Sequence, residues 1–251
     1  MIKRLFLAAA LLAGGPAIHA TENTFEFSGL TASDYQTGTS QYLVYMRDTS
    51  SGKIMQMELW NRTTKLIEQE GETLVEITQD WHVADGSGRE IRSLNRVEDF
   101  SPVAQTATHQ PDGTVTAFTF DGAMAKGDKS VEGNSAADFE IAMEQETLNW
   151  ELDIETFALL PLEANKTFKL NFYHPGSKTP PTVYNYTVAG EETLTDMSGN
   201  ALPCWLLEIN YGGQGGATFW LRKDTGEMLR MEETYGKIKR YKVRLGVAVE
   251  Q

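Results

Sequence analysis

The segment from Trp205 to Leu221, WLLEINYGGQGGATFWL, contains two strand patterns and the turn that joins them. In its first half, apolar side chains alternate with Glu208 and Asn210. A second alternation runs from Ala217 to Leu221, and a period of two is typical of strands with one buried face. The glycines within residues 211–216 tolerate the positive φ of a tight turn. This segment therefore predicts an antiparallel hairpin.

The same alternation recurs along the chain, between clusters of Gly, Asp and Asn that are typical of turns. It occurs in Lys53 to Trp60, Thr73 to Trp81, Thr114 to Phe120, Phe168 to Phe172 and Arg240 to Leu245. The side chains expected to be buried in the first and last of these runs are Met55, Met57, Leu59, Tyr241, Val243 and Leu245. The cations of the last run, Arg240, Lys242 and Arg244, are expected at the surface. The pattern predicts a mainly β protein with long antiparallel strands.

One stretch, Asp153 to Leu162, departs from this pattern. Its apolar residues have spacings closer to those of a helix, Asp153 is a candidate N-cap, and Pro161 would end the helix. The preceding segment, Ser135 to Leu152, fits either a strand or an amphipathic helix, and we favour a strand. A single short apolar helix among many strands favours a large curved antiparallel sheet, a half-open barrel, wrapped round that helix. A two-sheet sandwich is the alternative.

Residues 1–20 have the features of a bacterial secretory signal peptide. Lys3 and Arg4 precede the apolar run Leu5 to Ala13, which is too short to span a bilayer. Cleavage after Ala20 fits the small residue there, and a buried N-terminal helix is the alternative interpretation. We expect a leader at 1–20, a single β-rich domain at 21–251, a periplasmic or secreted location, and no transmembrane segment.

The chain is acidic. Its formal net charge is −13, and removal of Lys3 and Arg4 with the leader would change this to −15. Such a charge argues against a nucleic-acid partner, because phosphate binding needs a basic surface. Cys204 is the only cysteine, so no disulfide can form within one chain. We expect it to be buried and unreactive.

Two motifs resemble catalytic or cofactor-binding sequences but lack their context. Asp224-Thr225-Gly226 is the tripeptide of aspartic proteases. Those enzymes need a second aspartate that shares a proton with the first, and the tripeptide has no second copy in this sequence. A hairpin turn with Gly226 at positive φ explains it. The glycines of residues 211–216 precede a strand rather than a helix, which argues against a phosphate-binding loop. The chain also has no Gly-x-Ser-x-Gly motif of the α/β-hydrolases.

The histidines and strand carboxylates form no recognisable site in the sequence. The three histidines after residue 20 are His82, His109 and His174, widely separated and without helical i, i+4 spacing. Glycoside hydrolysis would need two carboxylates facing each other across a concave sheet. Glu58, Glu76 and Glu208 instead fall on the polar faces of their strands. We therefore assign no catalytic residue, and predict neither a metal nor a cofactor.

Cations and aromatic residues each gather in a way that allows two interpretations. Near the C-terminus stand Lys237, Lys239, Arg240, Lys242 and Arg244. They could bind anionic headgroups or an acidic partner. A sheet edge or a solvent-exposed face paired with its neighbour is favoured, because a turn at Tyr235-Gly236 would place Glu232 opposite Lys239. The tryptophans and several methionines could line an adaptable apolar cavity or form a packed core, and the core is favoured. These residues are Trp60, Trp81, Trp150, Trp205, Trp220, Met55, Met57, Met143, Met228 and Met231.

A resemblance rests on four features between Leu152 and Leu245, under half of the chain. They are Leu160-Pro161-Leu162, Val188-Ala189-Gly190-Glu191, Trp205 and Trp220. With them the segment resembles a group of uncharacterised secreted bacterial proteins. That group is similar in architecture to the periplasmic lipoprotein carriers of the LolA and LolB type, whose half-open barrels hold acyl chains under a helical lid. The resemblance implies a half-barrel fold and a hydrophobic or lipid-like ligand.

Three functional hypotheses follow. The first is an exported, non-enzymatic protein that binds a hydrophobic or lipid-like ligand within its curved sheet. The second is a structural or interaction module of the cell envelope, which would contact its partner through an edge strand or the basic C-terminal strand. The third and least favoured is a hydrolase of envelope polysaccharide.

Overall fold

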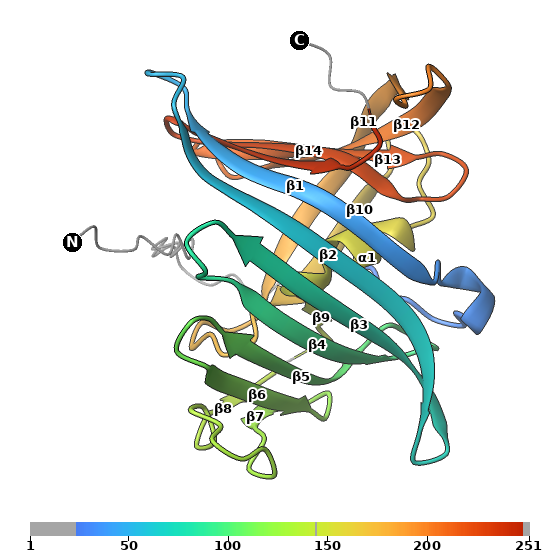
Figure 1. Cartoon of the computed structure of the whole chain (residues 1–251). Coiled ribbons are helices and arrows are strands. Elements are labelled where there is room, and N and C mark those ends of the chain that lie inside the picture. Colours follow the sequence, from blue (N-terminus) through green and yellow to red (C-terminus); the bar gives the residue numbers. More distant parts are fainter. Residues whose placement is uncertain (1–23, 144, 248–251) are drawn as a thin grey trace.

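The computed structural model describes residues 24–143 and 145–247, and the predicted leader lies outside them. In this part of the chain, fifteen strands form one sheet (Figure 1). The strands are β1 (Gly38–Asp48), β2 (Ile54–Gln69), β3 (Glu72–Val83), β4 (Arg89–Arg96), β5 (Pro102–His109), β6 (Thr114–Phe120), β7 (Met124–Gly127), β8 (Glu140–Ala142), β9 (Leu148–Asn149), β10 (Thr167–Tyr173), β11 (Thr182–Thr195), β12 (Ala201–Asn210), β13 (Gly215–Arg222), β14 (Met228–Tyr235) and β15 (Ile238–Arg244). The helical segments are the 3₁₀ helices η1 (Ala32–Asp34) and η2 (Trp150–Leu152) and the helix α1 (Asp153–Ala158).

The strand order is β8-β7-β6-β5-β4-β3-β2-β1-β15-β14-β13-β12-β11-β10-β9. All neighbours are antiparallel except β9 and β10. Most neighbours are also consecutive in the chain, as short hairpins require. The exception is the pair of β1 and β15, which are neighbours in the middle of the sheet although they lie at opposite ends of the chain. The last strand therefore lies at the centre of the sheet, and the strands at its edges are β8 and β9.

The hairpin of β12 and β13 has the predicted alternation. Leu207 lies opposite Phe219 and Ile209 opposite Ala217, and all four side chains are buried. The loop between the strands contains glycines with positive φ, as a tight connection requires. One face of this hairpin thus enters the core.

The short helix α1 lies on the concave side of the sheet, where the sheet curls so that β10 and β11 lie behind β1 and β2 (Figure 1). Leu152, at the start of the helix, and Phe157 within it have no exposed surface. The ring of Phe157 packs against Tyr186 on β11 and Phe219 on β13, at centroid distances of 4.9 and 4.8 Å. A curved antiparallel sheet wrapped round a short helix is therefore confirmed.

The predicted orientation of the last strand is wrong for most of its residues: Val243 is buried as expected, but Leu245 is 43% exposed. On β15, Lys242 is 4% exposed and faces the concave interior, whereas Tyr241 stacks on Tyr45 at 4.6 Å on the outer face. The physical reason is that Asp153, the first residue of α1, lies in the interior and pairs with Lys242. The strand is also not an edge, and Lys239 lies opposite Thr234 rather than Glu232.

The predicted inner face of β2 is wrong in the same way. Met55 and Met57 are exposed by 54% and 47%, while Trp60 and Arg62 on the opposite face are buried. The interior accepts Arg62 because acidic and amide groups satisfy its guanidinium. Polarity alone therefore does not identify the inner face of this sheet.

The segment before the helix and its N-cap also differ from expectation. Among the described residues of this segment, 135–143 and 145–152, the regular elements are the short strands β8 and β9 and the 3₁₀ helix η2. Leu152 occupies the N-cap position of α1, and Asp153 is the first helical residue. The helix ends at Ala158, ahead of Pro161, whose ring cannot continue a helix.

Candidate functional site

Two hollows open on the concave side of the sheet, and residues of α1 line both, while η2 contributes to the second alone. The first is a polar pocket of about 370 Å³ that Ile154, Glu155 and Ala158 help to line. The second is a cleft of about 340 Å³ that Trp150 and Glu151 help to line, here called the aromatic cleft. The two hollows differ in how many of their polar groups already form hydrogen bonds or ion pairs within the chain.

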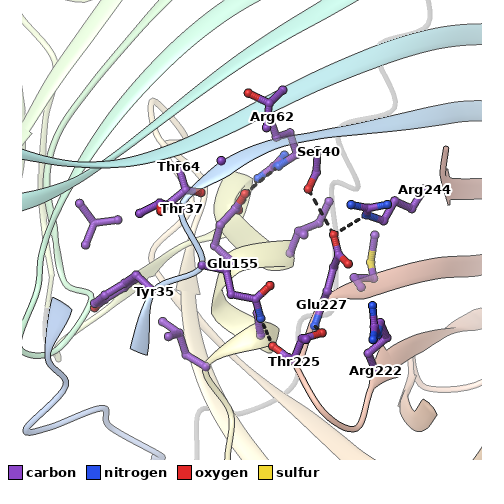
Figure 2. Close-up of a pocket in the computed structure, with 18 of the residues that line it drawn as sticks. Tyr35, Thr37, Ser40, Arg62, Thr64, Glu155, Arg222, Thr225, Glu227 and Arg244 are labelled. Atoms are coloured by element: carbon purple, nitrogen blue, oxygen red, sulfur yellow. Dashed lines mark hydrogen bonds and ion pairs between the residues drawn. The ribbon is translucent and has the colours of Figure 1, made fainter. Parts of the chain in front are cut away.

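In the polar pocket, four of the charged side chains form two ion pairs (Figure 2). Glu227 accepts hydrogen bonds from Ser40 and Arg244. Arg62 forms an ion pair with Glu155 at 2.5 Å. Because these groups satisfy one another within the chain, they connect the strands to α1 and leave little polar capacity for a ligand.

A second set of hydrogen bonds fastens the segment before α1 to the concave face of the sheet. Gln79 on β3 accepts a hydrogen bond from Arg62 at 2.6 Å and donates one to the Glu151 carbonyl at 3.1 Å. The Glu151 carboxylate accepts from Arg89 at 2.8 Å and from Gln105 at 2.9 Å. Side chains of β2 to β5 therefore hold this short helical segment in place.

The first residue of α1 forms a buried ion pair with the last strand. Asp153 Oδ2 accepts a hydrogen bond from Lys242 Nζ at 2.6 Å, and both side chains are almost fully buried. Burial raises the pKa of Asp153, but Lys242 and Arg62 outweigh it and hold that pKa below its ordinary value. Asp153 is thus ionised at neutral pH.

The aromatic cleft is walled on one side by two stacked tryptophans. Trp60 and Trp81 lie opposite each other on β2 and β3, with ring centroids 4.1 Å apart and an interplanar angle of 8°. Arg89 lies over the Trp81 ring at 4.8 Å, and Arg240 and Lys242 lie over the Trp60 ring at 5.4 and 5.2 Å. Cations stacked on aromatic faces fix the position of both.

The other side of the cleft is also aromatic. Trp150 on η2 packs against His174 and Tyr184, each at a centroid distance of 4.7 Å. Burial lowers the pKa of His174, which makes the neutral imidazole the main form at pH 7. The remaining lining residues are Met46, Glu151, Asp153, Tyr211, Gln214, Glu233, Tyr235 and Ile238. Aromatic and aliphatic side chains therefore provide most of the lining surface, and six charged side chains lie among them.

The carboxylates of the cleft already have partners. Glu151 binds Arg89 and Gln105, Asp153 binds Lys242, and Glu233 accepts from the Tyr211 hydroxyl at 3.1 Å. Burial and Glu233 raise the pKa of Tyr211 far above its ordinary value, so its hydroxyl stays protonated. These carboxylates and the Tyr211 hydroxyl are therefore suited to holding neighbouring side chains in place rather than to transferring protons.

The structure does not bring the strand carboxylates singled out in the sequence together. Glu58 on β2 accepts from the Trp60 indole at 2.5 Å, Glu76 on β3 pairs with Arg92 at 2.6 Å, and Glu208 lies on β12. The three stand on separate strands with separate partners. A paired-carboxylate site therefore does not arise from them.

The histidines and the cysteine lie apart as well. His174 lines the aromatic cleft, while His82 contacts Asn61 on the sheet surface. Among residues 24–143 and 145–247, no group of three or more His, Cys, Asp or Glu side chains is arranged to hold a metal ion. Cys204 is buried on β12, and burial raises the pKa of its thiol to about 11.

The two glycine motifs are turns, as predicted. Gly226 has φ +73°, and a Cβ there would collide with the carbonyl oxygen of Ala158, so this hairpin packs against the end of α1. Asp224 pairs with Arg222 at 2.5 Å instead of facing a second aspartate. The loop of residues 211–216 joins β12 to β13 and contributes Tyr211 and Gln214 to the cleft.

No local pattern indicates the buried Asp153–Lys242 pair, because 89 positions separate the two residues. The sequence pattern weakly indicates one part of the cleft: the alternation in β3 places Trp81 on the same face as the core residues Val75 and Ile77. The stacking of Trp81 on Trp60 depends on the register of β2 and β3.

The chain is thus a large curved antiparallel sheet with a cleft on its concave side, and comparisons with known proteins place it in a family. The family model of a protein of unknown function, DUF3108, matches residues 41–243. The chain therefore belongs to this family. Its match confirms the expected resemblance to uncharacterised proteins, and the resemblance to LolA and LolB stays a prediction. No curated protein matches the sequence.

Two solved structures are similar to this chain. One is a β-barrel-like protein of the domain of unknown function DUF1849 from Brucella abortus, with 8% identity, a TM-score of 0.50, and coverage of 89% of this chain and 100% of that chain. The other is a DUF1329 family protein from Desulfovibrio piger, with 11% identity, a TM-score of 0.33, and coverage of 87% and 88%. The first supports the fold alone. In the described part of the chain, no helix is long and apolar enough to cross a membrane.

Proposed function

We propose that the protein is exported and binds a small, largely apolar ligand in the aromatic cleft without transforming it. The observation that carries this proposal is the cleft itself, where the Trp60–Trp81 stack faces Trp150 and Tyr184 across a hollow of about 340 Å³. A concave, mostly apolar cavity with a few fixed polar groups is the usual form of a ligand site.

The size of the cleft limits the ligand. Small-molecule sites have volumes of about 300 to 1,000 Å³, and this cleft lies near the lower limit. It suits one acyl chain or one flat ring system better than a lipid with several chains. The protein would therefore differ from lipoprotein carriers in the size of what it holds.

Polysaccharide hydrolysis has weaker support. Glycosidases need one carboxyl group that is protonated near neutral pH and a second that is ionised. The lowered pKa of Asp153 excludes it from the acid role, and Arg89 and Gln105 engage both oxygens of Glu151. These carboxylates are better explained as anchors of the segment around α1.

A second candidate function is an interaction module, supported by one observation on the outer face. Met55 and Met57, near the tip of the β1–β2 hairpin, are half exposed, and exposed apolar side chains of this kind mark contact surfaces. Serine at both positions should remove a protein cross-link formed in the cell envelope. An unchanged cross-linking pattern would contradict this function.

Export through the predicted leader is tested by the N-terminus of the protein recovered from envelope fractions. The proposal expects a chain that begins at Thr21. A full-length chain that remains in the cytoplasm would contradict export.

Ligand binding is tested with N-phenyl-1-naphthylamine, a neutral apolar dye that fluoresces in apolar sites. Ile238→Asp places a charge among the lining residues and should weaken dye binding by about tenfold or more. The matched control is Ile54→Asp, since Ile54 is 49% exposed on the outer face. Equal affinities of the two variants, or no saturable binding by the unaltered protein, would contradict the proposal.

A further inference from the structure

Arg240 differs from the other cations of the aromatic cleft because its guanidinium has no close partner. Its Nε is buried and has no hydrogen-bond acceptor among the described residues. Among the described residues, its ion-pair partner is Glu233, and the distance from Arg240 Nη1 to Glu233 Oε2 is 4.0 Å, which is long for an ion pair. A buried donor without an acceptor is unfavourable, and such a group in a native structure calls for an explanation.

The other two cations of the cleft are engaged. Lys242 donates to Asp153 at 2.6 Å, and Arg89 donates to Glu151 at 2.8 Å. The Nε of Arg89 also lacks a partner, but its guanidinium already has a close carboxylate. Arg240 is therefore the cation of this cleft with the most unused hydrogen-bonding capacity.

The surroundings of Arg240 place this capacity next to apolar surface. Its guanidinium lies over the Trp60 ring at 5.4 Å. Two apolar residues next to Arg240 line the same cleft: Met46, which pairs with Arg240 across β1 and β15, and Ile238 on β15. A ligand with one anionic end and an apolar body would satisfy both features. Arginine suits such an end because its planar guanidinium binds a carboxylate through two parallel hydrogen bonds.

We propose that the ligand of the aromatic cleft is an amphipathic monocarboxylate whose carboxylate binds Arg240 while its apolar body lies against the aromatic walls. This inference rests on the proposed function and names the class of ligand. A singly charged group fits better than a phosphate monoester, because Glu151, Asp153 and Glu233 line the same cleft and would repel a second negative charge.

Arg230 provides a matched control outside the cleft. It stacks over Trp220 at 4.8 Å, much as Arg240 stacks over Trp60, and it pairs with Glu232. It does not line the aromatic cleft. Neutralising Arg230 thus removes an arginine stacked on a tryptophan without changing the site.

The test compares decanoate with decanol by calorimetric titration of the full chain at pH 7.5. The unaltered protein should bind decanoate about tenfold or more tightly than decanol, because only decanoate offers a charged acceptor. Arg240→Gln should reduce this preference to about one, whereas Arg230→Gln should keep it. Arg240→Lys, which retains the charge but not the planar fork, should keep part of the preference.

The outcomes separate this inference from the proposed function. Equal binding of decanoate and decanol, or a preference that survives in Arg240→Gln, would overturn the inference while leaving an apolar ligand site in place. Failure of both probes and of the neutral dye would overturn the proposed function itself. The comparison of the two probes on the unaltered protein needs no variant, so it holds even if Arg240→Gln folds poorly.

Discussion

Lys242, on the last strand, and Asp153, the first residue of the short helix, meet at 2.6 Å in the interior of the curved sheet. Because β15 lies at the centre of the sheet, this contact ties the helical segment to the middle of the concave face. The same segment carries Trp150 and Glu151, which line the aromatic cleft. The ion pair therefore positions one wall of the candidate site.

Breaking this pair should destabilise the protein strongly. Lys242→Met leaves the Asp153 carboxylate buried without its cation, which costs about 3–5 kcal/mol. The double variant Asp153→Leu/Lys242→Met should recover much of that loss, because no charge is then left unpaired. Chemical denaturation monitored by tryptophan fluorescence measures the free energy of unfolding of both variants.

The control is Lys239→Met. Lys239 pairs with Glu232 at 3.8 Å and its side chain is 39% exposed, so its loss should cost about 0–1 kcal/mol. A smaller loss for Lys242→Met than for Lys239→Met would contradict a structural role for the buried pair.

The stability of the fold should fall at acid pH, in part through Asp153. Its pKa is lower in the folded protein than in the unfolded chain. A carboxyl group with a lowered folded pKa contributes stability that is fully present above its unfolded value, about 3.9, and is lost as pH falls through the folded value. The denaturation midpoint of the unaltered protein should therefore drop between pH 5 and pH 3.

The variant Asp153→Asn should show a flatter pH dependence over that range, starting from lower stability. Asp138→Asn is the control, since Asp138 is almost fully exposed and pairs with Lys129 at 3.4 Å. If the Asp153→Asn curve fell as steeply as that of Asp138→Asn, the ion pair would not be the source of this acid sensitivity.

Alanine at two hairpin glycines should have different effects. Gly226 and Gly236 both have positive φ, which costs a residue with a Cβ about 1 kcal/mol. At Gly226 the new Cβ would also collide with the Ala158 carbonyl, whereas at Gly236 it meets open space. Thermal or chemical unfolding should show Gly226→Ala to be less stable than Gly236→Ala by about 1–3 kcal/mol. Similar losses would mean that the turn does not pack closely on α1.

The thiol of Cys204 should be unreactive in the folded protein. Burial raises its pKa to about 11, and its Sγ lies 3.2 Å from the Leu202 carbonyl oxygen, to which it donates. Because the thiolate is the reactive form, Ellman's reagent at pH 8 should react slowly with the native chain and rapidly after denaturation. Rapid reaction under native conditions would indicate an exposed thiol.

The sequence predicts the class of fold because alternation and turn residues are local properties. The hairpin of β12 and β13 and the burial of Phe168, Leu170 and Phe172 on β10 follow from them. Alternation fails to identify the inner face where polar side chains are buried. On β15 the buried Lys242 depends on Asp153, and no local pattern reveals that partner.

The candidate site is less predictable than the fold because strand pairing assembles it over long distances in the chain. Trp60 and Trp81 stack only because the β2–β3 register places them opposite each other. Arg240 reaches the cleft because β15 pairs with β1. A tryptophan inventory alone therefore suggests a core as readily as a cleft.

A ligand that binds between the tryptophans of the aromatic cleft should change their indole N–H resonances, and these signals provide the sharpest test of the proposed site. The chain has five tryptophans, of which Trp60, Trp81 and Trp150 line the cleft while Trp205 and Trp220 do not. Two-dimensional ¹H–¹⁵N spectra during a decanoate titration, assigned with Trp→Phe variants, report on all five. Binding in the cleft should produce saturable shifts of the three cleft signals, with the other two nearly unchanged. Shifts confined to Trp205 and Trp220, or no shifts at all, would contradict it.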